Sequence, residues 1–154
     1  MKFYLNKYMA KSIFKRPLKV LISAYACEPS KGSEPAIGWN WATEIANKGH
    51  HLVVFTRLNN KKNIESFLEK NNLNLEGRIR FEYYDLPKFV LFIKKTFSLT
   101  RIYYLLWQFF VFKKIRKITK KEKFDLVHHL TFVSLRHFSH LGKLNIPLIL
   151  GPLA

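Results

Sequence analysis

Five short apolar runs alternate with segments of helical periodicity, and this alternation restricts the possible folds more than any other feature of the chain. The runs are predicted strands at residues 19–26, 51–56, 78–84, 124–130 and 147–150. The segments between them are predicted helices at residues 33–48, 61–71, 89–121 and 133–144, with a break in the third near 98–100. Strands that are apolar along nearly their whole length need cover on both faces, which a parallel sheet obtains from its crossover helices. The sequence therefore predicts an α/β fold, a Rossmann-like doubly wound parallel sheet in three layers, α/β/α.

The first predicted helix carries start and stop signals. Ser33 is placed to act as its N-cap, Glu34 lies in the first turn, where a negative charge is favourable, and Gly49 follows its last turn. Its inner face is expected to consist of the residues at helical spacing, which are Gly38, Trp41, Ala42, Ile45 and Ala46. The second helix is expected to turn Ile64, Phe67 and Leu68 inward.

The length of 154 residues, 48% of them hydrophobic, suits one compact domain. We assign residues 18–154 to this domain and residues 1–17 to a basic N-terminal leader, which lacks the apolar core of a signal peptide. The longest apolar run, residues 102–112, is shorter than the roughly 20 residues that a membrane-spanning helix needs. Cys27 is the single cysteine of the chain, which excludes an intramolecular disulfide and a cysteine-based zinc cluster.

In a doubly wound sheet the ligand lies beyond the carboxyl ends of the strands, so the loops at residues 27–34, at 130–134 and from 151 onward are the expected site. The first loop places Lys31 and Gly32 just before a helix, where free backbone N–H groups favour a phosphate. Its spacing matches neither the dinucleotide-binding glycine fingerprint nor the P-loop. On spacing alone, a plain capped turn is the alternative interpretation.

Three segments, in the same order along the chain, resemble the N-terminal domain of family 4 glycosyltransferases of the GT-B fold. Residues 23–42 are similar to that family's strand-one loop, which carries Gly-Ser-Glu and runs into a helix beginning with Gly-Trp. Residues 124–132, Phe-Asp-Leu-Val-His-His-Leu-Thr-Phe, resemble its Asp-x-Val-His segment, and residues 145–152 are similar to its closing strand. The match runs from Val20 to the last residue.

The resemblance implies the acceptor-side half of an enzyme that transfers a sugar from a nucleotide-sugar donor to a glycan or lipid-linked acceptor, with retention of anomeric configuration. The loop toward the donor phosphates would consist of Lys31, Gly32, Ser33 and Glu34. The donor is a substrate, so neither a cofactor nor a metal is expected. The family's paired glutamates belong to the nucleotide-binding half, so the resemblance implies a C-terminal domain or a partner subunit, and an inactive chain without it.

The fourth strand is the expected position of the catalytic group. On this strand, many relatives of the resembled family have a second histidine at the position of Leu130. In the first loop, many of them have a second glycine at the position of Ala36. His128, His129 and Thr131 are therefore alternative candidates. Because His128 and His129 are adjacent on a strand, they should point to opposite faces of the sheet, one beneath a helix and the other toward the cleft. The alternative is that both histidines are structural.

Basic and aromatic residues alternate between residues 88 and 123, and they contribute to a net charge of +17. Cationic, aromatic-rich helices bind the interface of anionic membranes, as an enzyme with a lipid-linked acceptor would require. The expected membrane-contact residues are Lys94, Lys95, Trp107, Lys113 and Lys114. Nucleic acid is the rival partner, but no DNA- or RNA-binding signature is present, so none is expected.

Two other interpretations stay open. The chain can be a non-catalytic, basic membrane-binding module that kept this fold, or one subunit of a split glycosyltransferase. All three interpretations place it in the cytoplasm, peripheral at the inner face of the membrane.

Overall fold

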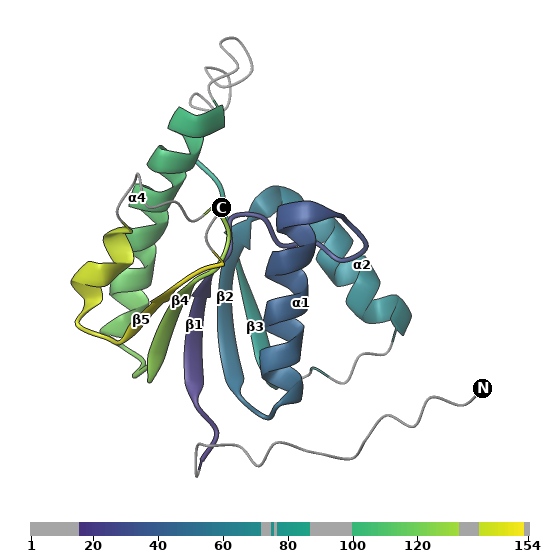
Figure 1. Ribbon diagram of the computed structural model, residues 1–154, viewed down its shortest axis with the longest axis horizontal. Helices are drawn as coiled ribbons and strands as arrows, with labels where there is room; N and C mark the ends of the chain where they lie inside the picture. The colour runs from purple at the N-terminus through teal and green to yellow at the C-terminus, as the bar shows by residue number, and fades with distance from the viewer. Residues whose placement is uncertain (1–15, 72–74, 76, 87–99, 133–138, 153–154) are drawn as a thin grey trace.

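Figure 1 shows the computed structural model, which describes residues 16–71, 75, 77–86, 100–132 and 139–152. Five strands form one sheet in the order β3-β2-β1-β4-β5, and every neighbouring pair is parallel. The strands are β1 (Lys19–Ser23), β2 (His51–Arg57), β3 (Ile79–Tyr84), β4 (Leu126–His129) and β5 (Leu148–Leu150). The chain moves outward from β1 in one direction and then in the other, which is the doubly wound arrangement. The predicted fold class is confirmed.

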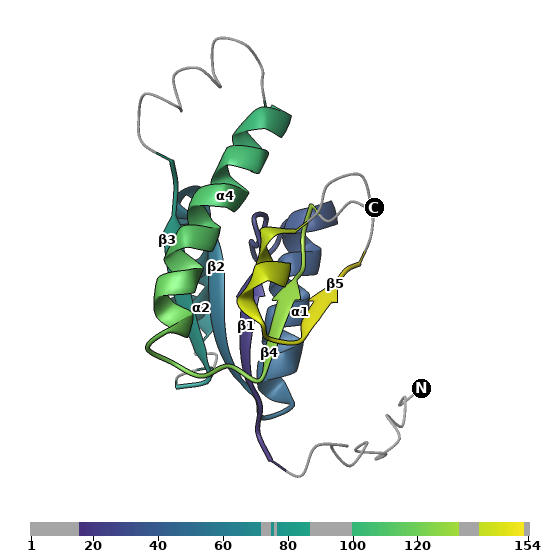
Figure 2. The same ribbon diagram turned by 90° about the vertical axis from the view of Figure 1, so that its left-hand side faces the viewer.

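Helices cover both faces of the sheet. On one face lie α1 (Ser33–Asn47) and α2 (Lys61–Asn71), and on the other lie α4 (Thr100–Thr119) and the 3-10 helix η2 (His140–Leu144), as Figures 1 and 2 show. A short 3-10 helix, η1 (Leu58–Asn60), joins β2 to α2. Residues 1–15 of the expected leader, residues 89–99 of the helix expected at 89–121 and residues 133–138 of the helix expected at 133–144 lie outside the described residues.

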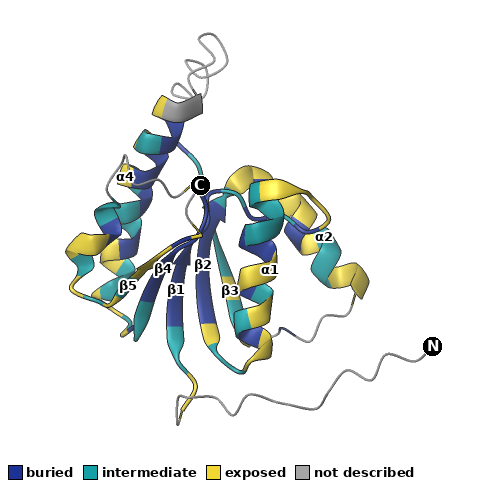
Figure 3. Ribbon diagram, viewed as in Figure 1, coloured by how far each residue is buried: buried dark blue, intermediate teal, exposed yellow. Residues whose placement is uncertain are grey.

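Alternate residues of β1 supply two separate cores. Val20 and Ile22 face α1 and α2, whereas Leu21 faces α4 and packs in the cluster that contains Trp107. The central strands are buried and the outer faces of the helices are exposed (Figure 3). This explains why the strands lack the polar alternation of a sheet with one wet face.

Helix α1 differs in two respects from its prediction. The residue preceding the helix is Gly32, which as N-cap supplies no side-chain hydrogen bond, while Ser33 is the first helical residue and has a positive φ of 55°. The predicted Ser33 cap is therefore wrong. Trp41 is also not in the core, because it is 48% exposed, whereas Trp39 is 6% exposed. The Trp39 ring lies edge-on to Phe67, with centres 5.4 Å apart, and stacks on Phe81 at 6.1 Å.

The close approach of α1 to β1 explains which tryptophan is buried. Gly38, Ala42 and Ala46 form the buried stripe, and their small size brings the helix against the turn after β1. With 3.6 residues per turn, Trp39 lies at one margin of this stripe and Trp41 lies beyond the other. The predicted inner face of α1 therefore had the correct small residues but included Trp41 in place of Trp39.

Candidate functional site

The three loops that the sequence singled out meet at the carboxyl edge of the sheet. The Ala26 amide donates to Thr131 Oγ1 at 3.1 Å, which joins the loops after β1 and β4. The Phe132 amide donates to Glu34 Oε2 at 3.2 Å, which joins the loop after β4 to the start of α1. His128 Nε2 lies 2.8 Å from the carbonyl oxygen of Gly151, which joins β4 to the loop after β5.

Gly32 is exposed at the tip of the first loop, and the fold itself does not require a glycine there. Its backbone is extended, with φ −93° and ψ 175°, which any residue adopts. A Cβ atom built on it would meet no described atom within 4 Å. Lys31 and Ser33, on either side, are also exposed, and Glu34 is half-buried. The loop therefore presents an open backbone beside one lysine, at the start of a fifteen-residue helix.

Gly38, six residues later, is a glycine that the fold does require. A Cβ atom there would lie 2.1 Å from the carbonyl oxygen of Ala26. The two glycines of the motif thus have different roles. Gly38 lets α1 pack on the turn after β1, whereas Gly32 leaves the backbone of its loop open on the surface of the domain.

The two strand-four histidines point to opposite faces of the sheet, as predicted. His128 lies edge-on to Trp41 of α1, with ring centres 5.5 Å apart, and His129 Nε2 lies 3.0 Å from the Tyr104 hydroxyl of α4. Both are buried, at 3% and 2% exposed, so neither imidazole reaches solvent. Thr131 is fully buried, and its hydroxyl is used by the Ala26 amide. The three candidates of the fourth strand remain predictions, and the structure places all three beneath the surface.

Burial controls the protonation of both histidines. It lowers the pKa of His129 to about 4, with a smaller contribution from the nearby His128, and it lowers the pKa of His128 as well. An imidazole with a pKa near 4 is neutral at pH 7, so His129 can donate or accept a hydrogen bond there but is a weak proton acceptor.

This burial predicts a loss of stability in mild acid. The unfolded chain binds a proton at His129 near pH 6.5 and the folded chain only near pH 4, so stability is full above about pH 6.5 and falls as the pH drops toward 4. The loss expected from His129 is roughly 3 kcal/mol, and His128 adds to it in the same direction. Urea unfolding at pH steps from 7.5 to 4.5 measures this. His129→Gln should lower stability at pH 7.5 and flatten its pH dependence; an unchanged slope would contradict the assignment.

Sequence reasoning missed a polar cluster around Tyr25 at the same edge. Arg57, at the end of β2, has its guanidinium carbon 4.9 Å from the centre of the Tyr25 ring. Arg57 Nε lies 3.7 Å from Asp85 Oδ1, just after β3, and this oxygen accepts a hydrogen bond from the Tyr103 hydroxyl at 2.6 Å. Arg57 is the last residue of β2 and Asp85 directly follows β3, and this position at the carboxyl ends of strands is the signal that could have identified them.

The expected membrane-contact residues separate in the structure. Trp107 is fully buried and its Nε1 donates to the carbonyl oxygen of Tyr84 at 2.9 Å, so its predicted membrane contact is wrong. The reason is that Trp107 belongs to the stripe of α4 that packs on the sheet. Lys113 is exposed over the rings of Phe109 and Phe110, and Lys114 lies 3.7 Å from Glu82. Lys94 and Lys95 lie outside the described residues.

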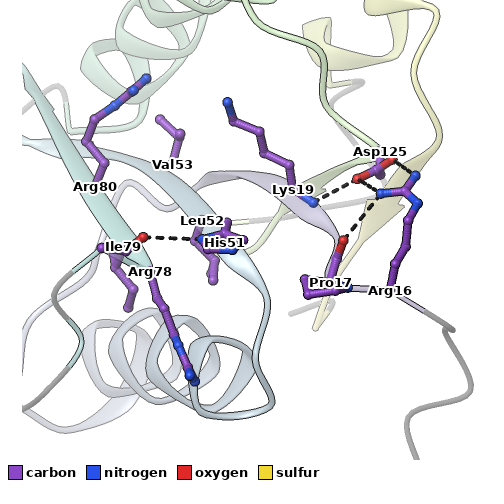
Figure 4. A pocket seen from close by; sticks show the side chains of 11 residues that line it. Arg16, Pro17, Lys19, His51, Leu52, Val53, Arg78, Ile79, Arg80 and Asp125 are labelled. Atoms are coloured by element: carbon purple, nitrogen blue, oxygen red, sulfur yellow. Dashed lines mark hydrogen bonds and ion pairs between the residues drawn. The ribbon is translucent and has the colours of Figure 1, made fainter.

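A cavity of about 540 Å³ at the opposite, amino edge of the sheet is basic but not a better candidate (Figure 4). Its cationic lining residues are Arg16, Lys19, Arg78 and Arg80. Arg16 is paired with Asp125, and Figure 4 shows this pair at one end of the cavity. Lys19 and Arg80 both contact Glu122, at 2.8 and 2.9 Å. Arg16, Lys19 and Arg80 are thus paired with carboxylates, and Arg78 donates to the carbonyl oxygen of Ala46 at 3.2 Å, so the cations of the cavity already have partners within the protein.

Comparison of the sequence with models of known protein families gives no match, and comparison with curated proteins gives none either.

Proposed function

We propose that this domain is the acceptor-side half of a glycosyltransferase similar to the GT-B, family 4 enzymes. The observation that carries the proposal is Gly32, an exposed glycine that neither its backbone conformation nor its neighbours require. It lies at the carboxyl edge of the sheet, next to Lys31 and before the uncapped amides of α1. A loop of this kind allows a phosphate to approach the backbone closely, and the start of a helix attracts negative charge.

In this proposal, a donor-binding domain from the same polypeptide or a partner subunit completes the site. The nucleotide-sugar phosphates face Lys31 and Gly32, and the acceptor lies against the loop after β4. The acceptor hydroxyl oxygen forms the new glycosidic bond while the bond from the sugar to the phosphate breaks. The hydroxyl proton passes to the departing phosphate oxygen, and the nucleotide leaves with the phosphates. The neutral, buried His129 and His128 are proposed to hold the loops after β4 and β5 in place, since each contacts a neighbouring element.

The test is a screen of nucleotide-sugar donors with the domain joined to a donor-binding domain, with hydrolysis and transfer of labelled sugar measured. Transfer by the joined enzyme is expected from at least one donor. The 154-residue chain alone is the control and is expected to show no turnover above buffer. Turnover by that chain alone would contradict the division of the site between two domains.

A second candidate function, membrane binding without catalysis, is favoured by the outer surface of α4. Three apolar side chains of one helical stripe are exposed: Ile102 at 50%, Leu106 at 37% and Phe109 at 39%. The same stripe continues into Lys113 at i+4 and Lys117 at i+8 from Phe109, both exposed. Apolar residues followed by cations suit the interface of an anionic bilayer, which a lipid-linked acceptor would also require. In the described part of the chain, no helix is both long enough and apolar enough to cross a membrane.

Binding to anionic vesicles is therefore expected, and it should decrease with salt because exposed charges are screened within about 8 Å at physiological ionic strength. Co-sedimentation with phosphatidylserine-containing and with phosphatidylcholine vesicles measures it. Phe109→Glu should reduce binding several-fold. Leu58→Glu is the matched control, since Leu58 is also an exposed apolar residue, at 51% against 39% for Phe109, and lies outside α4. Equal binding to both kinds of vesicle, or equal effects of the two variants, would exclude this surface.

A further inference from the structure

A pocket of about 430 Å³ lies at the amino edge of the sheet, on the face that α4 and η2 cover. It is lined by the end of α4, by Phe124 and Ile146 just before β4 and β5, and by the end of η2. η2 packs alongside α4 (Figures 1 and 2), because the His140 ring lies 5.7 Å from that of Phe109 and 5.9 Å from that of Phe112. This pocket shares no described lining residue with the cavity of Figure 4.

Four cationic side chains line this pocket, which are Arg116, Lys120, Lys123 and Lys143. Among the described residues, no Asp or Glu lines it, and none forms an ion pair with Arg116, Lys120 or Lys123. The cavity of Figure 4 differs in this respect, since its cations have partners within the protein. Like charges around one pocket repel one another, and an anion that enters the pocket relieves this repulsion.

Helix ends account for only part of this positive charge. Arg116 lies in the last turn of α4 and Lys143 in that of η2, where the partial negative charge of a helix C-terminus favours a cation. That attraction falls off within the last turn. Lys123 lies beyond the end of α4 at Thr119, yet it lines the same pocket. Cations from α4, from the segment after it and from η2 thus converge on one space, and this convergence points to an anionic ligand.

The apolar lining of the pocket indicates what carries the anion. Phe124, Leu144 and Ile146 belong to the core around Trp107 or pack against it, and Leu144 and Ile146 are only half-buried. The pocket therefore suits a ligand that combines an anionic group with an apolar part. A phosphate matches the cations, because a phosphomonoester carries about −1.5 to −2 charges at pH 7 and pairs with an arginine through two parallel hydrogen bonds. Phospholipids combine a phosphate with apolar chains.

The position of the pocket favours a lipid over a soluble phosphate ester. Arg116 is at i+7 from Phe109 and so lies on the same side of α4. Phe109 belongs to the exposed apolar stripe for which membrane binding is proposed above, with Ile102 and Leu106 nearer the start of the helix. The pocket is therefore at the cationic end of that stripe. A soluble ligand would need no exposed apolar stripe beside its site.

We propose that this pocket binds the phosphate of an anionic membrane lipid, with the four cations around the phosphate and the glycerol part of the lipid against the apolar lining residues. The proposal deepens the membrane binding proposed above and rests on it, because it assigns the lipid headgroup to one place on that surface.

An NMR titration of the ¹⁵N-labelled 154-residue chain tests the pocket with three probes: glycerol 3-phosphate, dihexanoyl phosphatidic acid below its micelle concentration, and glycerol. Both phosphate probes should shift the amide signals of residues 116–124 and 143–146 in a saturable manner, and glycerol should not. The lipid should bind at least about five-fold more tightly than glycerol 3-phosphate, because its chains add apolar contact.

The double variant Arg116→Gln/Lys120→Gln should weaken binding of the soluble lipid at least about ten-fold, since it removes two charge-assisted contacts to the phosphate. Lys113→Gln/Lys117→Gln is the matched control. It removes the same charge from the same helix, but neither of these exposed lysines lines the pocket. Its affinity for the soluble lipid should stay within about two-fold of the parent chain, because distant exposed charges are screened.

Three results would overturn this inference: no saturable shift at the pocket residues, equal effects of the two double variants, or lipid binding no tighter than that of glycerol 3-phosphate. The last result would assign the pocket to a soluble phosphate ester instead. The pocket and the membrane surface can fail separately. Binding of the soluble lipid in the pocket without binding to vesicles would contradict the membrane surface. Vesicle binding that Phe109→Glu weakens and Arg116→Gln/Lys120→Gln does not would contradict only the pocket.

Discussion

The substitution Gly38→Ala is expected to lower the free energy of unfolding by at least about 3 kcal/mol, and by more if the domain cannot rearrange. The added Cβ atom would lie 2.1 Å from the Ala26 oxygen and 3.1 Å from both the Ala26 carbonyl carbon and Cys27 Cα. All three are backbone atoms, so no side-chain rotation relieves the overlap. Helix α1 would have to move away from the turn after β1, and the buried contacts of Trp39 and Ala42 would loosen with it.

Gly32→Ala is the matched control, because it makes the same chemical change six residues earlier. There the backbone is extended and no described atom lies within 4 Å of the added carbon. Its effect should stay within about 0.5 kcal/mol, since surface substitutions away from special features rarely exceed that. Urea unfolding followed by tryptophan fluorescence compares the two variants. Similar losses for both would mean that α1 does not approach the turn as closely as described.

The substitution Gly32→Val is expected to lower the rate of sugar transfer by the joined two-domain enzyme at least a hundred-fold. The branched side chain occupies the space that the proposed phosphate approach requires, and it blocks the backbone of a loop that the fold leaves open. Stability should change little, because valine favours an extended backbone such as the φ of −93° and ψ of 175° found here. The measurement is the transfer rate with the donor that the screen identifies, together with a melting curve.

Gly142→Val is the control for this variant. Gly142 is an exposed glycine of η2, and a Cβ atom there would make an ordinary contact with Leu148 Cδ2 at 3.8 Å. Its transfer rate should equal that of the parent enzyme. If Gly32→Val also stays within a few-fold of the parent, the loop is only a turn, and the phosphate side of the site must be sought in the loop after β4.

The local sequence pattern predicted the bounds of an element correctly where residues close together in the sequence determine its structure. Helix α2 has the predicted bounds of residues 61–71, and Gly49 ends α1 with a φ of 93° that favours glycine. β1 was predicted too long, to residue 26 rather than Ser23, because Ala24 and Tyr25 are as buried as a strand although they lie in the turn. Burial and hydrogen-bonded pairing are different properties, and only the first can be estimated from apolar residues.

Only part of the candidate site could be predicted from the sequence, because some of its residues follow turn signals and the others are brought together by packing alone. Residues 27–34 and 130–134 follow strands with clear turn signals, so the rule for parallel sheets placed them at one edge. Tyr25 was interpreted as part of a strand, and neither Arg57 nor Asp85 belongs to a sequence motif. Their cluster forms only when the ends of β1, β2 and β3 meet α4, and those segments are separated by tens of residues.

By itself, the sequence determined the parallel sheet, the helices on both of its faces and the edge at which its loops converge, because hydrophobic periodicity and turn residues are local properties. The tertiary structure alone decided which tryptophan of α1 is buried, that Trp107 belongs to the core and that both strand-four histidines lie beneath the surface. It also decided that Tyr25, Arg57 and Asp85 lie together. These outcomes depend on how far each helix rotates and how closely it approaches the sheet, and packing between residues distant in sequence determines both.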